Sequence, residues 1–141
     1  MTYFVEVEVR GYELDTQGHL DQAVYLQYAE HARWGLLREA GVAHEKLPAD
    51  GIGPVQPEVT VKYLGELRGG DRVRASCELL YGTGKTFEIR RQVVKDHGTV
   101  AAEIAGVGGL IDLTARRLVT DPAGRFASLA TKPELLGIRT V

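Results

Sequence analysis

Cysteine is almost absent from this chain of 141 residues, in which Cys77 is the single example. One cysteine excludes an intramolecular disulfide and any zinc site that needs several thiolates. Because Cys77 lies in the alternating run RVRASCELLY, we expect it to be a small buried hydrophobic residue and not a nucleophile. A chain without a disulfide framework also fits a reducing cytoplasm, which is the location we expect.

The chain also lacks a long apolar run and a strong excess of one charge. No stretch reaches the roughly 18 apolar residues needed to span a bilayer, so membrane insertion is not expected. The formal net charge is only −2, and the basic residues are scattered, which makes nucleic acid a poor candidate partner. The N-terminus MTYFVEVEVRG alternates apolar and charged residues, which predicts a first strand and not a signal peptide.

The remaining composition is that of a globular domain. Hydrophobic residues make up 44% and charged residues 26% of the chain, both ordinary values. A length of 141 residues is close to the usual size of one domain and short for two. We therefore expect a single domain over residues 1–141, with an irregular tail from about residue 122.

The hydrophobic pattern predicts one long helix after a first strand. Residues 3–10 alternate with the period of two that is typical of a half-buried strand. From about residue 22 to residue 40 the period becomes helical, with an apolar face made of Tyr25, Ala29, Ala32 and Leu36 and a polar face that includes Gln27, His31 and Arg38. Gly41 follows where a C-terminal cap is expected.

The second half of the chain is predicted to form strands joined by tight turns. After a loop from Lys46 to Pro54, the expected strands are VQPEVTVKY, DRVRASCELLY, TFEIRRQVVKD and TVAAEIAGVGGLID, separated by glycine-containing connections. From Leu113 we expect a short strand end and then an irregular or briefly helical tail. Five strands and one helix predict an α+β architecture in which an antiparallel sheet covers the helix.

Trp34 falls on the polar stripe of the predicted helix. A large ring in that place needs cover from water. Neighbouring segments of the same chain or a second subunit can supply this cover, and both alternatives stay open. Self-association is expected in either case.

An acid, a turn, a histidine and a helix start lie within eight residues, from Asp15 to Gln22. Asp21 is placed to cap the helix, whereas Asp15 lies too far from the helix for that role. Asp15 either fixes a turn or acts as a functional carboxylate. A carboxylate beside free helix N–H groups suits attack on a carbonyl, because those groups stabilise the developing oxyanion. His19 can orient a carboxylate or a thioester group.

Neither a metal nor a cofactor is expected. The acids near His19 do not come with a second histidine on the same helical face, which a metal-binding helix needs. A nucleophile motif of the form G-x-S-x-G and a glycine-rich phosphate loop are both missing. The glycines at 106, 108 and 109 lie inside a strand pattern, which favours close backbone packing or a bulge. Glu30 and Arg33 are expected to form a structural pair on the helix.

The pattern VRGYELD-x-x-x-H-x-x-x-A-x-YL-x-x-x-E-x-ARW resembles the hotdog-fold acyl thioesterases. The likeness is strongest to bacterial long-chain acyl-CoA thioesterases and to the 4-hydroxybenzoyl-CoA thioesterase group. A second block agrees, namely Tyr63-Leu64, the run LRGGD at 67–71, Gly84-Lys85 and Asp112-Leu113. The resemblance covers about residues 5–122. It implies a hotdog fold, an antiparallel five-stranded sheet wrapped around one long helix, which assembles into a homodimer or homotetramer with active sites between subunits.

The resemblance also implies roles for individual residues. Asp15 matches the catalytic aspartate, which acts as nucleophile or as general base for water. His19 matches a supporting histidine, and the backbone N–H that polarises the carbonyl belongs by position to Gln22. Gln17 stands where the plant acyl-carrier-protein thioesterases carry an asparagine. Gln17 is therefore expected to contact substrate, and Tyr25 on the helix is expected to do so as well.

One departure from the family pattern concerns the helix start. The common His-Val-Asn-Asn is here His19-Leu20-Asp21-Gln22, so a side-chain role of the asparagines is not carried over, whereas main-chain donors survive the change. The phosphates of the substrate are expected to meet cations drawn from Lys85, Arg116 and Arg117.

The implied activity is hydrolysis of an acyl-CoA or an acyl-carrier-protein thioester. The alternatives are a hotdog dehydratase, which needs a histidine and an acid working across the dimer, and a non-catalytic module that binds acyl thioesters.

Overall fold

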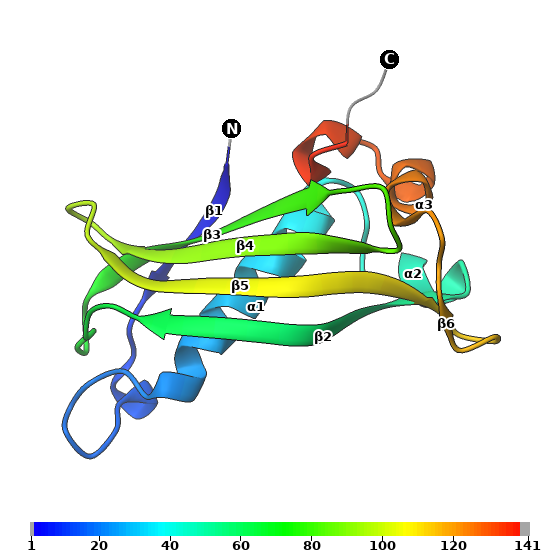
Figure 1. Ribbon diagram of the computed structural model, residues 1–141. Coiled ribbons are helices and arrows are strands. Elements are labelled where there is room, and N and C mark those ends of the chain that lie inside the picture. Colours follow the sequence, from blue (N-terminus) through cyan, green and yellow to red (C-terminus); the bar gives the residue numbers. More distant parts are fainter. Residues whose placement is uncertain (1, 139–141) are drawn as a thin grey trace.

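One antiparallel sheet packs around a single long helix in the computed structural model, which describes residues 2–138 (Figure 1). Along the sheet the strand order is β1-β3-β4-β5-β2, and the short β6 pairs with β5. The strands are β1 (Tyr3–Glu8), β2 (Ile52–Tyr63), β3 (Arg72–Tyr81), β4 (Thr86–Lys95), β5 (Val100–Asp112) and β6 (Arg117–Leu118). The helices are α1 (Gln22–Glu39), α2 (Lys46–Ala49) and α3 (Pro122–Leu129), with 3-10 turns at Gly11–Glu13 and Pro133–Leu136. This arrangement confirms the predicted α+β architecture.

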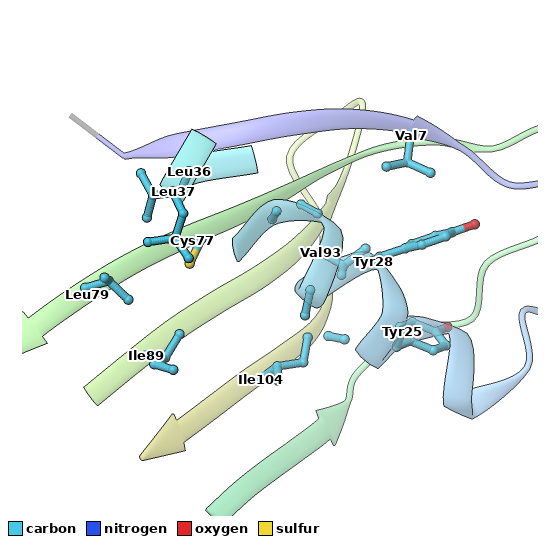
Figure 2. Close-up of a cluster of buried hydrophobic side chains, with 14 of the residues drawn as sticks. Val7, Tyr25, Tyr28, Leu36, Leu37, Cys77, Leu79, Ile89, Val93 and Ile104 are labelled. Atoms are coloured by element: carbon cyan, nitrogen blue, oxygen red, sulfur yellow. The ribbon is translucent and has the colours of Figure 1, made fainter. Parts of the chain in front are cut away.

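The long helix α1 forms where the periodicity predicted it. The Asp21 side chain accepts a hydrogen bond from Ala23 N at 3.0 Å, which confirms Asp21 as the N-terminal cap. Gly41 follows the helix with φ +92°, a left-handed conformation that suits glycine after a helix end. The predicted apolar face is buried against the sheet, and Figure 2 shows Tyr25, Tyr28 and Leu36 among the strand side chains of this core.

The core confirms two further predictions. Cys77 is 1% exposed, and burial raises the pKa of its thiol to about 12, so Cys77 is an inert part of the core (Figure 2). Gly108 lies in β5 where a Cβ atom would come within 2.7 Å of the Phe87 ring. Close packing between β5 and β4 therefore accounts for this glycine, as predicted.

Two segments differ from the sequence-based expectation. The short helix α2 lies within the predicted loop, and β2 begins at Ile52 and not at Val55. Pro54 lies inside this strand opposite Leu110. Proline lacks the N–H group that would bond to a neighbouring strand, and it is tolerated here because β2 is at the edge of the sheet and has a neighbouring strand on one side only. The tail, expected to be irregular or briefly helical, contains the helix α3, and Asp121 caps it by accepting a hydrogen bond from Gly124 N at 3.1 Å.

Trp34 is half-buried and is covered by its own chain. The His44 ring lies 3.6 Å from the Trp34 ring, centroid to centroid, at an angle of 72°. The Arg33 guanidinium lies 5.2 Å from the same ring, within the range of a cation–π contact. Its own chain thus covers part of the Trp34 ring, and contact of the ring with a second subunit stays a prediction.

None of the helices within residues 2–138 combines the length and the apolar character that a membrane span requires.

Candidate active site

Asp15 lies in a tight turn that leaves one of its carboxylate oxygens free. Its Oδ1 accepts hydrogen bonds from Gln17 N at 2.8 Å and His19 N at 3.1 Å. The turn closes through Asp15 N, which donates to His19 O at 2.7 Å, and Gly18 adopts the φ of +76° that the turn requires. Within residues 2–138, Oδ2 has no hydrogen-bond partner. The backbone therefore orients the carboxylate and leaves Oδ2 available for chemistry.

Glu13 anchors this turn to the long helix. The Tyr28 hydroxyl of α1 donates to Glu13 Oε1 at 2.5 Å, and Arg10 donates to the same carboxylate from its backbone N at 2.9 Å. The Glu13 carbonyl accepts from Asp21 N at 3.0 Å. Burial alone would raise the pKa of Glu13, but the hydrogen bonds from Tyr28 and Arg10 outweigh it and hold the pKa below its ordinary value.

Replacing Glu13 by Gln is expected to destabilise the protein by about 1–2 kcal/mol at neutral pH, because hydrogen bonds to a charged acceptor are lost. A carboxyl whose pKa is lowered by folding stabilises the protein above the ordinary pKa, and that contribution disappears as the pH falls through the lowered value. The difference between wild type and E13Q should therefore shrink in acid. Urea unfolding at neutral and acidic pH measures it.

The matched control for E13Q is Glu6→Gln. Glu6 is a glutamate whose side chain is 75% exposed and whose contact with Arg74 is 3.9 Å long. Exposed pairs of this kind contribute little to stability, so E6Q should unfold like wild type. An E13Q protein as stable as E6Q at neutral pH would contradict the anchoring role of Glu13.

His19 is held against the segment that links β2 to β3. It forms an antiparallel bridge with Arg68, and the next residue, Leu20, donates from its backbone N to Leu67 O at 2.7 Å. The ring Nε2 lies 2.7 Å from Glu66 Oε2. The histidine ring is therefore placed by two segments that are far apart in the sequence.

The start of α1 offers a free backbone donor a few residues after Asp15. The first helical residue is Gln22, and its N–H has no acceptor within residues 2–138. The following N–H groups, of Ala23 and Val24, both bond to the capping residue Asp21. Since the helix dipole places partial positive charge at this end, the Gln22 N–H is suited to bind an oxyanion.

Two tyrosines build the wall beside the helix start. The Tyr25 hydroxyl donates to Gly65 O at 3.0 Å, and the Tyr63 hydroxyl donates to Gln22 O at 3.0 Å. Their rings meet edge to face with centroids 5.2 Å apart. Burial raises the pKa of Tyr25, which is 3% exposed. Both hydroxyl protons are thus used to join α1 to the end of β2 and to the loop that follows it.

These groups line one open pocket of about 550 Å³. It brings together four of the residues that the sequence singled out, Asp15, His19, Gln22 and Tyr25. The remaining lining residues are Leu20, Asp21, Tyr63, Leu64, Gly65 and Glu66. The pocket combines an oriented carboxylate, an imidazole and a helix N–H that has no acceptor within residues 2–138. Groups of these kinds can take part in attack on a carbonyl.

The other predicted site residues lie outside this pocket. Gln17 is exposed in the same turn, where its backbone N–H serves Asp15. Arg117 pairs with Asp112, which pairs in turn with Ile52 at the start of β2, whereas the pocket lies at the end of this strand. Twelve residues of β2 at about 3.3 Å each separate the two ends by roughly 35 Å.

Lys85 and Arg116 lie at the same distant end of the sheet as Arg117. Lys85 directly precedes Thr86, which pairs with Gly109 near the end of β5, and Arg116 lies in the turn between β5 and β6. Within one chain, the structure therefore does not bring the three predicted cations to the pocket.

Sequence reasoning missed Glu66 and the role of Tyr63. Both come from the end of β2 and the loop after it, which the order of the strands brings beside the helix start. The Tyr63-Leu64 pair was visible as part of a family pattern, but nothing near Glu66 in the sequence indicates its contact with His19.

The sheet order, the single wrapped helix and the pocket at its start define a hotdog-fold domain. The profile of the thioesterase-like superfamily matches residues 9–132. The chain therefore belongs to this superfamily, and the resemblance inferred from the sequence is confirmed.

Known relatives agree with this assignment. The chain is 38% identical over 68 residues to the chloroplastic acyl-acyl carrier protein thioesterase ATL3 of Arabidopsis thaliana, a match that covers 48% of this chain and 36% of the plant protein. It is 28% identical over 113 residues to the long-chain acyl-CoA thioesterase FadM of Escherichia coli, covering 79% of this chain and 85% of FadM.

Among solved structures, the probable thioesterase YbaW of Escherichia coli superposes with a TM-score of 0.81 at 23% identity, over 97% of this chain and 99% of YbaW. At this level of identity the superposition shows a shared fold.

Proposed function

We propose that this protein hydrolyses an acyl thioester to a free carboxylic acid and a thiol. The observation that carries the proposal is that two groups without a hydrogen-bond partner within residues 2–138, Oδ2 of Asp15 and the N–H of Gln22, belong to residues that line the same pocket. One can activate or perform the attack on the thioester carbonyl, and the other can hold the oxygen on which negative charge develops.

The reaction then runs in two stages. Asp15 either takes a proton from an attacking water molecule or attacks the carbonyl carbon itself, and the carbonyl oxygen becomes an oxyanion beside Gln22 N–H. The oxyanion collapses, the carbon–sulfur bond breaks, and the thiolate leaves and is protonated. In the second route, water then cleaves the anhydride formed with Asp15 and regenerates the carboxylate.

The substrate class is inferred from the relatives. FadM is named for long-chain acyl-CoA and ATL3 for an acyl carrier protein, so an acyl group on one of these two carriers is the proposed substrate. Release of free thiol from a panel of acyl-CoA and acyl-carrier-protein thioesters tests the activity. Binding without thiol release across the panel would contradict hydrolysis and favour an acyl-binding module.

We further propose that a second copy of the chain completes the site. β2 lies at the edge of the sheet order, and Val59 on it is 36% exposed. Such an edge favours pairing with another strand. An antiparallel pair of β2 strands would place the start of one β2 beside the end of the other.

Lys85, Arg116 and Arg117 of the second copy would then approach the pocket and could meet the phosphates of the substrate. Sedimentation equilibrium tests the association: a protein that remains monomeric at assay concentration while fully active would contradict it.

A proline at position 22 should remove the oxyanion donor and leave the helix intact. Proline lacks an N–H group and is favoured at the first position of a helix. Asp21 already has the extended conformation, φ −60° and ψ 136°, that a residue before proline needs. Since the Gln22 N–H bonds to nothing within residues 2–138, Q22P should fold normally and lose about 10²–10³-fold in kcat.

The matched control is Gln22→Ala, which removes the side chain and keeps the N–H. Q22A should retain most of the wild-type kcat, because the proposal assigns the role to the backbone. Thermal unfolding of both variants checks that the helix start is preserved. Equal turnover of Q22P and wild type would remove Gln22 from the mechanism.

A further inference from the structure

Glu66 makes a direct contact with the ring of His19 at the pocket. Glu66 Oε2 lies 2.7 Å from His19 Nε2, and both residues line the same cavity as Asp15. A carboxylate oxygen can only accept in this contact, so Nε2 carries the proton. In the neutral ring, Nδ1 is then the nitrogen with the free lone pair.

The segment that carries Glu66 is fixed on both sides. Before it, Leu64 N and Gly65 N both donate to Ala101 O, at 2.9 and 3.0 Å, and the Gly65 carbonyl accepts from the Tyr25 hydroxyl at 3.0 Å. After it, the Leu67 carbonyl accepts from Leu20 N at 2.7 Å. The carboxylate is therefore presented to His19 from a backbone with little freedom to move.

We propose that Glu66 is a positioning residue that holds the His19 ring in one orientation and one tautomer at the mouth of the pocket. The inference rests on the proposed hydrolysis, because it assigns His19 a part in that reaction. With Nε2 tied to Glu66, Nδ1 remains as a hydrogen-bond acceptor for the attacking water or for a donor group of the substrate. A carboxylate that fixes the tautomer of a histidine from behind is a common way to orient a working imidazole.

The competing explanation is that Glu66 only forms surface ion pairs. Arg68 Nη2 lies 3.2 Å from Glu66 Oε1, and the two side chains are 65% and 51% exposed, so this pair contributes little to stability. The His19 side chain is 26% exposed, and it is the more sheltered partner of Glu66. The two contacts use different oxygens of the carboxylate, and variants can separate them.

Three variants test the role of Glu66 in thioester hydrolysis. Glu66→Ala removes the acceptor and should lower kcat about 10- to 100-fold, with a smaller change in KM, because the ring is no longer held for reaction. Glu66→Gln keeps an oxygen that accepts from Nε2 and should retain most of kcat. Arg68→Gln removes only the surface pair and should behave as wild type. A loss in R68Q equal to that in E66A, or a loss in E66Q equal to that in E66A, would overturn the proposal.

A double variant shows whether Glu66 acts through His19. Once His19 is replaced by Ala, adding Glu66→Ala should cause no further loss of kcat, because residues that act through one another are not additive. A further loss of the same size in the double variant would show that Glu66 works independently of His19 and would overturn the proposal.

The tautomer can be observed without any substrate. Nitrogen-15 NMR of the imidazole, assigned by the signal that disappears in His19→Ala, should show the form protonated at Nε2 in wild type and in E66Q, and a mixture of tautomers in E66A. This measurement is independent of turnover. If the protein hydrolyses no thioester, the proposed function fails while the effect of Glu66 on His19 is still decided by the spectrum, and a tautomer unchanged in E66A would refute it.

Discussion

Replacing Asp15 by Asn should abolish most thioester hydrolysis while leaving the fold unchanged. The amide oxygen of Asn can still accept from Gln17 N and His19 N, which now bond to Oδ1 at 2.8 and 3.1 Å, so the turn should persist. What is lost is the negative charge on the free oxygen, which the proposed chemistry needs in either route. A fall in kcat of about 10²–10⁴-fold is expected, the usual contribution of a positioned acid or base, with KM little changed.

Asp21→Asn is the control for this variant. Asp21 lines the same pocket, but its side chain caps α1 through Ala23 N. Asparagine caps helices about as well as aspartate, so D21N should keep both its stability and most of its turnover. The comparison separates a carboxylate that reacts from one that shapes the helix start. Hydrolysis by D15N at the rate of D21N would contradict the assignment of Asp15 as general base or nucleophile.

Wild type and D21N, which both keep Asp15, can distinguish the two routes. In a single turnover in isotopically labelled water, a general base delivers the label directly to the product acid. A nucleophilic carboxylate whose anhydride is cleaved at the aspartyl carbon carries the label itself. Mass spectrometry of the peptide that contains Asp15, with D21N as the active comparison, shows where the label resides.

The parts of the fold that could be predicted from the sequence depend on local patterns. The period of α1, its cap at Asp21 and the glycine after it at position 41 all act over a few residues. The start of β2 could not be predicted in this way. Pro54 favours a loop in the local sequence, and its place in a strand is decided by pairing with Leu110, a partner more than fifty residues away.

The residues of the candidate site also differ in whether the local sequence predicts them. Asp15, His19 and Gln22 could be found because they follow one another within a single turn and helix start. Glu66 and the role of Tyr63 could not, since the positions of both residues depend on the length of β2 and on where it ends relative to α1. The three cations are predicted only from their residue type and their places at turns and strand ends. Within one chain they lie near the start of β2, whereas the pocket lies at its end, and twelve residues at about 3.3 Å each separate the two by roughly 35 Å.

The pairing of Glu30 with Arg33 was predicted from their spacing on the helix and is confirmed, with Nη2 and Oε2 2.6 Å apart. The pairing is part of a larger cluster. In β4 the core positions alternate as Ile89, Arg91 and Val93, so an arginine occupies a position that faces the helix. Arg91 Nη1 lies 2.8 Å from Glu30 Oε1.

The Arg91 side chain is 0% exposed, whereas that of Glu30 is 31% exposed. Burial would raise the pKa of Glu30, but the hydrogen bonds from Arg33 and Arg91 prevail and lower it, and burial lowers the pKa of Arg91. Gln56 also accepts from Arg91 Nη2, at 2.5 Å. Glu30 is therefore the one carboxylate in this cluster, shared by two guanidinium groups that are largely or wholly out of water.

Replacing Glu30 by Gln should accordingly be the most destabilising change among the variants considered, at about 3 kcal/mol, because it leaves a buried arginine without a counter-charge. Arg91→Met should cost less, since Glu30 then still pairs with Arg33 and keeps some contact with water. The double variant with both changes should be more stable than E30Q alone, because it also removes the buried positive charge that E30Q leaves without a counter-charge. Urea unfolding of the three proteins measures the order.

The control is the neighbouring residue on the opposite face of β4. Arg90 pairs with Glu88 at 2.7 Å, but its side chain is 60% exposed, so Arg90→Met should change stability by about 0.5 kcal/mol or less. The pH dependence provides an independent check. A carboxyl whose pKa is lowered by folding contributes above its ordinary pKa and loses that contribution as the pH falls through the lowered value, so wild type should approach E30Q in acid. If E30Q matched R90M in stability at neutral pH, Glu30 would not be compensating a buried charge.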